Sequence, residues 1–186
     1  MKYLILIGIV AFAACHDNNH PNLNQPYLDS LMKADSSISV TALQAEKENN
    51  WNYYDDSDKM DGSKTYIAEN MSTNIISFSS PYDVSNFRLR IFHRHGQNEL
   101  LLSGSSCQFL TGIDGGTARV KFDAEKPMTI STSEPSDYSS DRIFLESAGK
   151  LISKMRNAKK MTIEAEFYRD GKRQIDFDVD SLKWTH

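Results

Sequence analysis

Short runs of alternating apolar and polar residues fill the chain from Trp51 onward, and Gly, Ser, Asp and Pro separate them. Alternation with a period of two places the apolar side chains on one face of a strand, which favours an antiparallel sheet with one buried face. We expect strands at 64–69, 74–79, 86–93, 99–103, 118–123 and 128–132. The pattern lengthens to a helical period only at 145–159, where five apolar residues share a face: Ala148, Leu151, Ile152, Met155 and Ala158. The sequence therefore predicts an α+β fold, mainly an antiparallel sheet forming a sandwich or partial barrel, with one long helix packed across it.

The last two predicted strands define a hairpin. One carries Met161, Ile163, Ala165 and Phe167, the other Ile175, Phe177 and Val179, and Arg169-Asp-Gly-Lys172 lies between them. A two-residue loop would mix core and solvent positions on each face. A three-residue loop at 169–171, with Gly171 left-handed, pairs Ala165 with Ile175 and Ile163 with Phe177. We therefore expect this second register, which gives one apolar face.

The opposite face of the hairpin gathers four carboxylates: Glu164, Glu166, Asp176 and Asp178. In the expected register Glu164 lies opposite Asp176, and opposed like charges need compensation. A metal ion or a shared proton would supply it, and paired carboxylates also serve glycoside hydrolysis. Basic residues on neighbouring strands would supply it too, and Arg88, Arg90, Arg119 and Lys121 alternate suitably. We favour a cross-strand charge ladder over a catalytic or metal site.

Other chemical motifs are incomplete. Asp176-Phe-Asp-Val-Asp180 and the acids between Asp55 and Asp61 lack the spacing of a calcium loop. His93 and His95 could begin a zinc site, but no third ligand is evident. The glycines at 112–116 precede no helix that could hold a phosphate. We therefore assign no catalytic residue, no metal ligand and no cofactor.

Aromatic residues are the remaining candidates for binding: Trp51, Tyr53, Tyr54, Tyr82, Tyr138 and Trp184. Such side chains can line a carbohydrate or protein interface. Packing at the ends of the sheet is the interpretation we favour for them.

The first fifteen residues indicate where the protein acts. Lys2 is followed by a mostly apolar run to Ala14, and Phe12-Ala-Ala14 directly precedes Cys15. This arrangement is typical of a secretory signal, and a cysteine at the cut resembles the bacterial lipobox, whose cysteine is lipidated. The run is shorter than the roughly 20 apolar residues that span a bilayer. We expect cleavage before Cys15 and lipid attachment, including palmitate, at that residue.

Four regions follow from these features: a lipoprotein signal peptide (1–14), a flexible tether (15–26), a marginal helical segment (27–50) and a β-rich domain (51–186). Cleavage changes the formal net charge from −4 to −5, so no basic field exists to attract nucleic acid. With Cys15 lipidated, Cys107 has no partner in the chain, and we expect it to be buried as a small apolar residue.

A series of motifs spans most of the domain: Trp51-x-Tyr53, Asp58-Lys-Met60, Asn74, Pro81-Tyr82, Arg90, Cys107-Gln-Phe109, Arg119-Val-Lys-Phe-Asp123, Ile143-Phe-Leu145, Ala158-Lys-Lys160, Ile163-Glu-Ala-Glu-Phe-Tyr168, Phe177-Asp-Val179 and Leu182-Lys-Trp184. This series resembles a family of small bacterial envelope lipoproteins, and more distantly accessory envelope proteins encoded near type VI secretion systems. Cys107 replaces the usual glycine, and no glycine follows Tyr82. The resemblance implies the fold and an envelope location, and it supplies no active-site residues.

Together these features predict an exported lipoprotein anchored to a bacterial membrane and exposed to the periplasm or the surface. We expect a non-enzymatic binding or interaction module, whose partner is a protein or a glycan of the envelope. One alternative is an enzyme that acts on envelope polymers through the acidic hairpin face. Another is a hydrolase inhibitor that inserts the loop at 81–86 or at 131–141 into its target.

Overall fold

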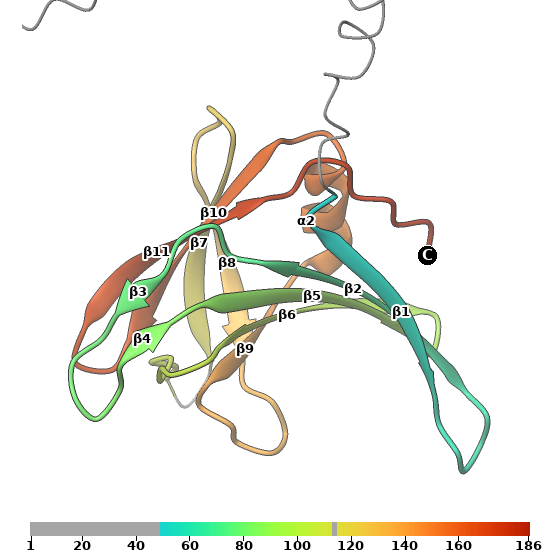
Figure 1. Ribbon diagram of the computed structural model, residues 1–186, viewed down its shortest axis with the longest axis horizontal. Coiled ribbons are helices and arrows are strands. Elements are labelled where there is room, and N and C mark those ends of the chain that lie inside the picture. Colours follow the sequence, from blue (N-terminus) through green and yellow to red (C-terminus); the bar gives the residue numbers. More distant parts are fainter. Residues whose placement is uncertain (1–48, 113–114) are drawn as a thin grey trace, which may run out of the picture. The chain divides into compact units, whose positions relative to one another are not determined.

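A computed structural model describes residues 49–112 and 115–186. These residues form a nine-stranded antiparallel sheet in the order β1-β2-β5-β6-β9-β8-β7-β10-β11, a small β3-β4 ladder and a helix (Figure 1). The strands are β1 (Trp51–Ser57), β2 (Lys64–Met71), β3 (Ile76–Ser77), β4 (Val84–Ser85), β5 (Phe87–Arg94), β6 (Gln97–Gly104), β7 (Gly116–Phe122), β8 (Met128–Ser133), β9 (Arg142–Leu145), β10 (Lys160–Phe167) and β11 (Gly171–Asp178), and the helix is α2 (Ala148–Met155). The predicted α+β class, mainly antiparallel sheet, is confirmed.

The sheet bends until the segment that follows β2 covers the outer edge of β11. The Thr73 amide donates to the Asp176 carbonyl over 2.7 Å. The Asn74 side chain donates to the Gln174 carbonyl over 3.0 Å and accepts from the Asp176 amide over 2.9 Å. These bonds satisfy part of an edge that would otherwise be open, and they make the sheet a partial barrel.

The inner face of the bent sheet holds the core. Four phenylalanines, Phe78, Phe87, Phe109 and Phe167, contact one another, with the rings of Phe109 and Phe167 4.7 Å apart and those of Phe78 and Phe167 4.8 Å apart. Full burial of a side chain of this size stabilises the fold by about 1.5–3 kcal/mol. This cluster fixes β10 and the 107–109 segment against β5.

Helix α2 is shorter than the predicted 145–159. Its Leu151, Ile152 and Met155 are buried, as the apolar stripe requires. At its start, Leu145 belongs to β9, and Ser147 has a left-handed φ of 63° that separates strand from helix. At its end, the Asp123 carboxylate accepts hydrogen bonds from the amides of Lys159 and Lys160, where β10 begins. Tertiary hydrogen bonds thus end a helix that the periodicity alone would extend.

The predicted strands are present with shifted ends, except that only Ile76–Ser77 of 74–79 is a strand. Two strands of the nine-stranded sheet, β1 and β9, were not expected. β1 has an exposed side chain at every position after Trp51, so it shows no alternation of apolar residues. β9 has only four residues, and its last one falls within the predicted helix.

The register of the final hairpin differs from the prediction. Phe167 pairs with Gly171 and Ile163 with Ile175, two residues from the expected partners. The loop is therefore 168–170, with φ of 64° at Arg169. The Tyr168 amide donates to the Gln108 carbonyl, which ends the ladder earlier than expected. Because side chains alternate between the two faces of a strand, a shift of two residues leaves each side chain on its predicted face, and the apolar face of the hairpin is kept.

The predicted signal peptide (1–14) and tether (15–26), with Cys15, lie outside the described residues, as does the helical segment 27–50 except for Asn49 and Asn50. Among the described residues, no helix has the length and apolar character needed to cross a bilayer.

Candidate functional site

A gap in the sheet creates a pocket beside β6. β6 runs from Gln97 to Gly104, but β9 pairs only with Leu101, Leu102 and Ser103. Beyond this point β9 turns away to pair with β8 and to lead into α2. The first half of β6 therefore has no strand partner on that side, and a pocket of about 550 Å³ opens there.

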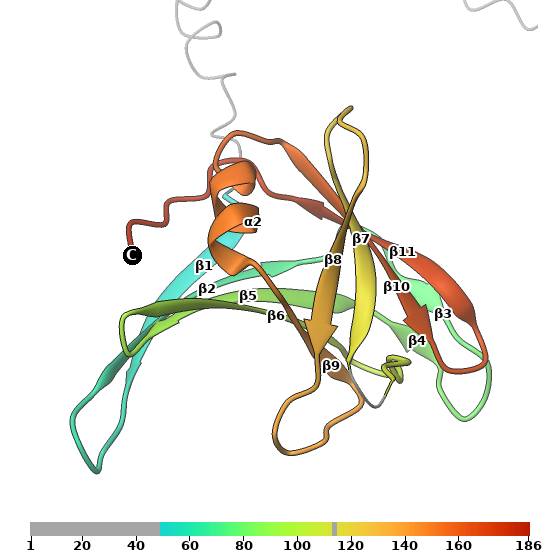
Figure 2. The same cartoon turned by 180° about the vertical axis from the view of Figure 1, so that it is seen from behind.

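We call this pocket the notch. The loop between β8 and β9 forms one rim and projects from the sheet (Figure 2). Tyr138 in this loop is 85% exposed, and its φ of 55° is left-handed. The lining residues are Arg94, Asn98, Glu99, Leu100, Ser133, Pro135, Ser136, Asp137, Phe144, Leu145, Glu146, Ser147 and Ala148. The floor is thus partly apolar, and its walls carry hydroxyl, amide and carboxylate groups.

The notch has a negative formal charge because three carboxylates face one guanidinium. Arg94 binds Glu99 through two hydrogen bonds of 3.1 and 2.5 Å, so these two charges compensate each other. Glu146 accepts a hydrogen bond of 2.6 Å from the Ser133 hydroxyl. This donor is neutral, so it does not balance the negative charge of the carboxylate. Hydrogen bonds from the side chain and backbone of Ser139 lower the pKa of Asp137. Two carboxylates, Asp137 and Glu146, therefore have no cationic partner among the groups that line the notch.

The acidic face of the hairpin does not bring the predicted carboxylates together. Glu164 lies opposite Gln174 on β11 and opposite Arg119 on β7. Arg119 donates two hydrogen bonds to it, of 2.8 and 2.7 Å, and Gln174 donates one of 3.1 Å. Arg119 first, and then Gln174, lower the pKa of Glu164. Asp176 instead accepts a hydrogen bond from the Thr162 hydroxyl.

This geometry forms part of the predicted charge ladder. Arg119 pairs with the hairpin, whereas Arg88 and Arg90 contact Glu69 on β2. The hollow beside Glu164, of about 250 Å³, contains that carboxylate and no second one. The close carboxylate pair proposed for glycoside hydrolysis is therefore not formed there.

The histidines occupy different environments. His95 and Gly96, with φ of 50° and 73°, form the two-residue turn between β5 and β6. His93 contacts Asn98, and its ring stacks against His186. Among residues 49–112 and 115–186, no three His, Cys, Asp or Glu residues are placed to hold a metal ion.

The aromatic candidates divide into buried and exposed groups. Trp51 and Trp184 are buried, and their ring nitrogens donate to the Val179 carbonyl and to Asn98. The Tyr82 hydroxyl donates to Gln108. Tyr53 and Tyr54 are 40% and 46% exposed on β1. Packing therefore explains the tryptophans and only some of the tyrosines.

Cys107 is buried, as predicted, and forms no disulfide within the part of the chain that the structure describes. Burial first, and then the charge of Asp141, raise the pKa of its thiol to about 12. A thiol that stays protonated is a poor nucleophile. Cys107 therefore contributes to the fold as a buried residue of the hydrophobic core.

Comparison of the chain with known protein families, with curated proteins and with solved structures found no match.

Proposed function

We propose that the protein is a membrane-tethered envelope lipoprotein whose globular part binds a basic segment of a partner protein in the notch. The observation that carries this proposal is the pocket itself, which combines an apolar floor with two carboxylates that have no cationic partner among its lining groups. The signal-like first fifteen residues support the tether, and the resemblance to envelope lipoproteins agrees with it.

The chemistry of the notch favours a lysine or arginine side chain. Leu100, Phe144 and Ala148 can contact an aliphatic stem, while Asp137 and Glu146 can bind its cationic end. An anionic group would instead meet two like charges. The proposed mechanism is non-covalent binding without catalysis. The tether sets how far from the membrane the globular part can bind, and the β8–β9 loop contacts the partner.

The lipid anchor is tested with a Cys15→Ala variant. Cells fed labelled palmitate should label the native chain and leave the variant unlabelled, and membrane fractionation should show loss of the variant from membranes. Protease treatment of intact cells then separates surface display from a periplasmic location. Equal labelling of the two chains, or labelling of neither, would contradict lipidation at Cys15.

Binding in the notch is tested with N-acetyl-trilysine amide as the probe. The double substitution Asp137→Asn, Glu146→Gln should weaken binding several-fold, because it removes both carboxylates that can pair with the cationic ends of the probe. Glu166→Gln removes one charge from an exposed position on β10 outside the notch and should leave the affinity unchanged. Equal affinity of the double variant and the native chain, by calorimetry, would refute the proposal.

A further inference from the structure

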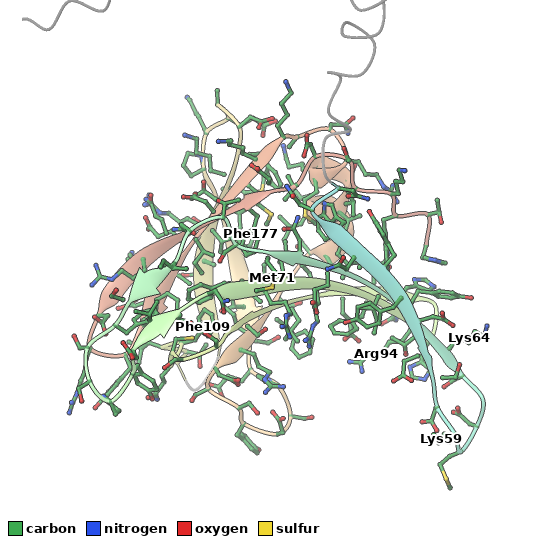
Figure 3. The ribbon with its side chains drawn as sticks, in the orientation of Figure 1. Lys59, Lys64, Met71, Arg94, Phe109 and Phe177 are labelled. Carbon is green, nitrogen blue, oxygen red and sulfur yellow. The ribbon has the colours of Figure 1, made fainter. Side chains whose placement is uncertain are left out.

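Another pocket lies on the outer face of the sheet, which we define by Arg88, Arg90, Phe92 and Arg94 of β5. It has a volume of about 140 Å³ and is lined by Met71, Asn86, Arg88, Ser103, Gly104 and Ser105. In Figure 3, Met71 marks this end of the face and Arg94 marks the notch end. Ser103 is four residues from Glu99 along β6, or about 13 Å at 3.3 Å per residue. The two pockets are therefore separate.

The charge of this pocket is opposite to that of the notch. Its lining contains a guanidinium, hydroxyl groups and an amide, and no carboxylate. Arg88 extends from β5, Ser103 lies directly opposite it on β6, and Asn86 precedes β5. Hydrogen-bond donors thus reach one small volume from three positions in the chain.

Arg88 is incompletely satisfied. Its Nε atom is buried and lies 3.3 Å from Glu69 Oε1, without the geometry of a hydrogen bond. Glu69 instead accepts a hydrogen bond of 2.7 Å from Arg90. Because one carboxylate serves two guanidinium groups, one positive charge remains uncompensated in this group. The backbone amide and carbonyl of Asn86 bind Ser105 and Ser85, but within the described residues the Asn86 side-chain amide and the Ser103 hydroxyl have no hydrogen-bond partner.

We propose that this pocket binds a phosphate group, with Arg88 as the cationic donor and Ser103 and Asn86 as neutral donors. A guanidinium can donate two hydrogen bonds in parallel to a phosphate. A tetrahedral anion also presents oxygens in several directions, which suits donors that come from β5, β6 and the segment before β5. The volume is several times the roughly 30 Å³ that one water occupies in the liquid, so it holds one such group, and any bulky substituent on the phosphate must extend out of the pocket. This site is independent of the basic segment proposed for the notch.

The test uses the isotope-labelled full chain in an uncharged detergent, titrated with sodium phosphate at constant ionic strength. Saturable shifts of the amide signals of Ser103, Gly104 and Ser105 are expected. Arg88→Gln should weaken binding at least tenfold, and Ser103→Ala should weaken it several-fold. The control is Arg173→Gln, because Arg173 has nearly the same exposure as Arg88, at 44% against 42%, and lies on β11 outside the pocket. The control should bind as the native chain does.

Soluble dihexanoyl phosphatidylglycerol distinguishes the sources of the phosphate. Binding of inorganic phosphate alone would support a free or terminal phosphate, whereas equal binding of the lipid would support a headgroup. Titration with sodium acetate at the same ionic strength tests the tetrahedral requirement. Equal affinity for acetate, shifts that do not saturate, or native affinity in both pocket variants would overturn the proposal. If Arg88→Gln disrupts the folded spectrum, Ser103→Ala decides the outcome.

Discussion

Replacement of Gly104 by alanine should destabilise the fold through a specific steric conflict with Cys107. A Cβ atom at position 104 would lie 2.4 Å from the Cys107 sulfur and 2.9 Å from Cε1 of Phe87. Ordinary van der Waals contacts between such atoms begin near 3.4 Å. Both neighbours are buried, so neither can move into solvent.

Two opposing effects set the magnitude. Alanine in a strand is favoured over glycine by up to about 0.5–1 kcal/mol, because the unfolded chain loses conformational freedom, and Gly104 is the last residue of β6. Overpacking of a filled core costs about 1–3 kcal/mol. The steric cost is the larger, so we expect Gly104→Ala to lower the free energy of unfolding by about 1–2 kcal/mol.

A double-mutant cycle identifies the cause. Cys107→Ala alone removes one buried sulfur and should cost about 1 kcal/mol. In that background the new methyl group occupies the vacated space, and only the contact with Phe87 remains. The two substitutions should therefore couple favourably by about 1 kcal/mol or more, measured by urea unfolding followed by tryptophan fluorescence. Additive costs would refute the steric argument, because they would show that the sulfur does not limit position 104.

Two further predictions concern ionisable groups. Burial raises the pKa of Cys107 to about 12, so the native thiol should not react with a disulfide reagent at pH 8. The same thiol should react fully in denaturing urea. Rapid labelling of Cys107 in the native chain would contradict its burial. The Arg119 guanidinium lowers the pKa of Glu164 from its ordinary value of 4.5, so the stabilisation from this carboxylate is present above that value and is lost as the pH falls through the lower folded pKa. The difference in free energy of unfolding between the native chain and Glu164→Gln, from urea titrations, should therefore shrink on acidification, and a constant difference would refute the coupling.

Alternation along the chain predicted much of the sheet because one face of each central strand is buried. β5 and β7 show this directly, with buried side chains at every second position over most of their length. β1 lies at the edge of the sheet and is exposed after Trp51, so the local sequence contains no sign of pairing. Its position depends on the register with β2, which is a long-range property of the fold.

The notch could not be predicted from motifs, because no motif defines it. It exists because β9 leaves β6 after Phe144 and enters α2 a few residues later. Glu99, Asp137 and Glu146 come from three different segments and look like ordinary surface residues in the sequence. The periodicity at 145–159 also concealed the end of β9, since Leu145 fits both a strand and a helix.

The hairpin shows why the composition of a face is easier to predict than the partners on it. Any shift by two residues keeps Ile163, Phe167 and Ile175 on the buried side, so hydrophobicity alone cannot choose between such registers. The choice is made by contacts from elsewhere: Gln108 binds the Tyr168 amide, and Asp170 accepts hydrogen bonds from Ser79. In the resulting register Glu164 meets Gln174 and Arg119, whereas the expected register would have placed it against Asp176. A two-residue shift thus turns a predicted repulsion between carboxylates into a compensated charge, and it removes the chemical reason for a metal ion or shared proton at that position.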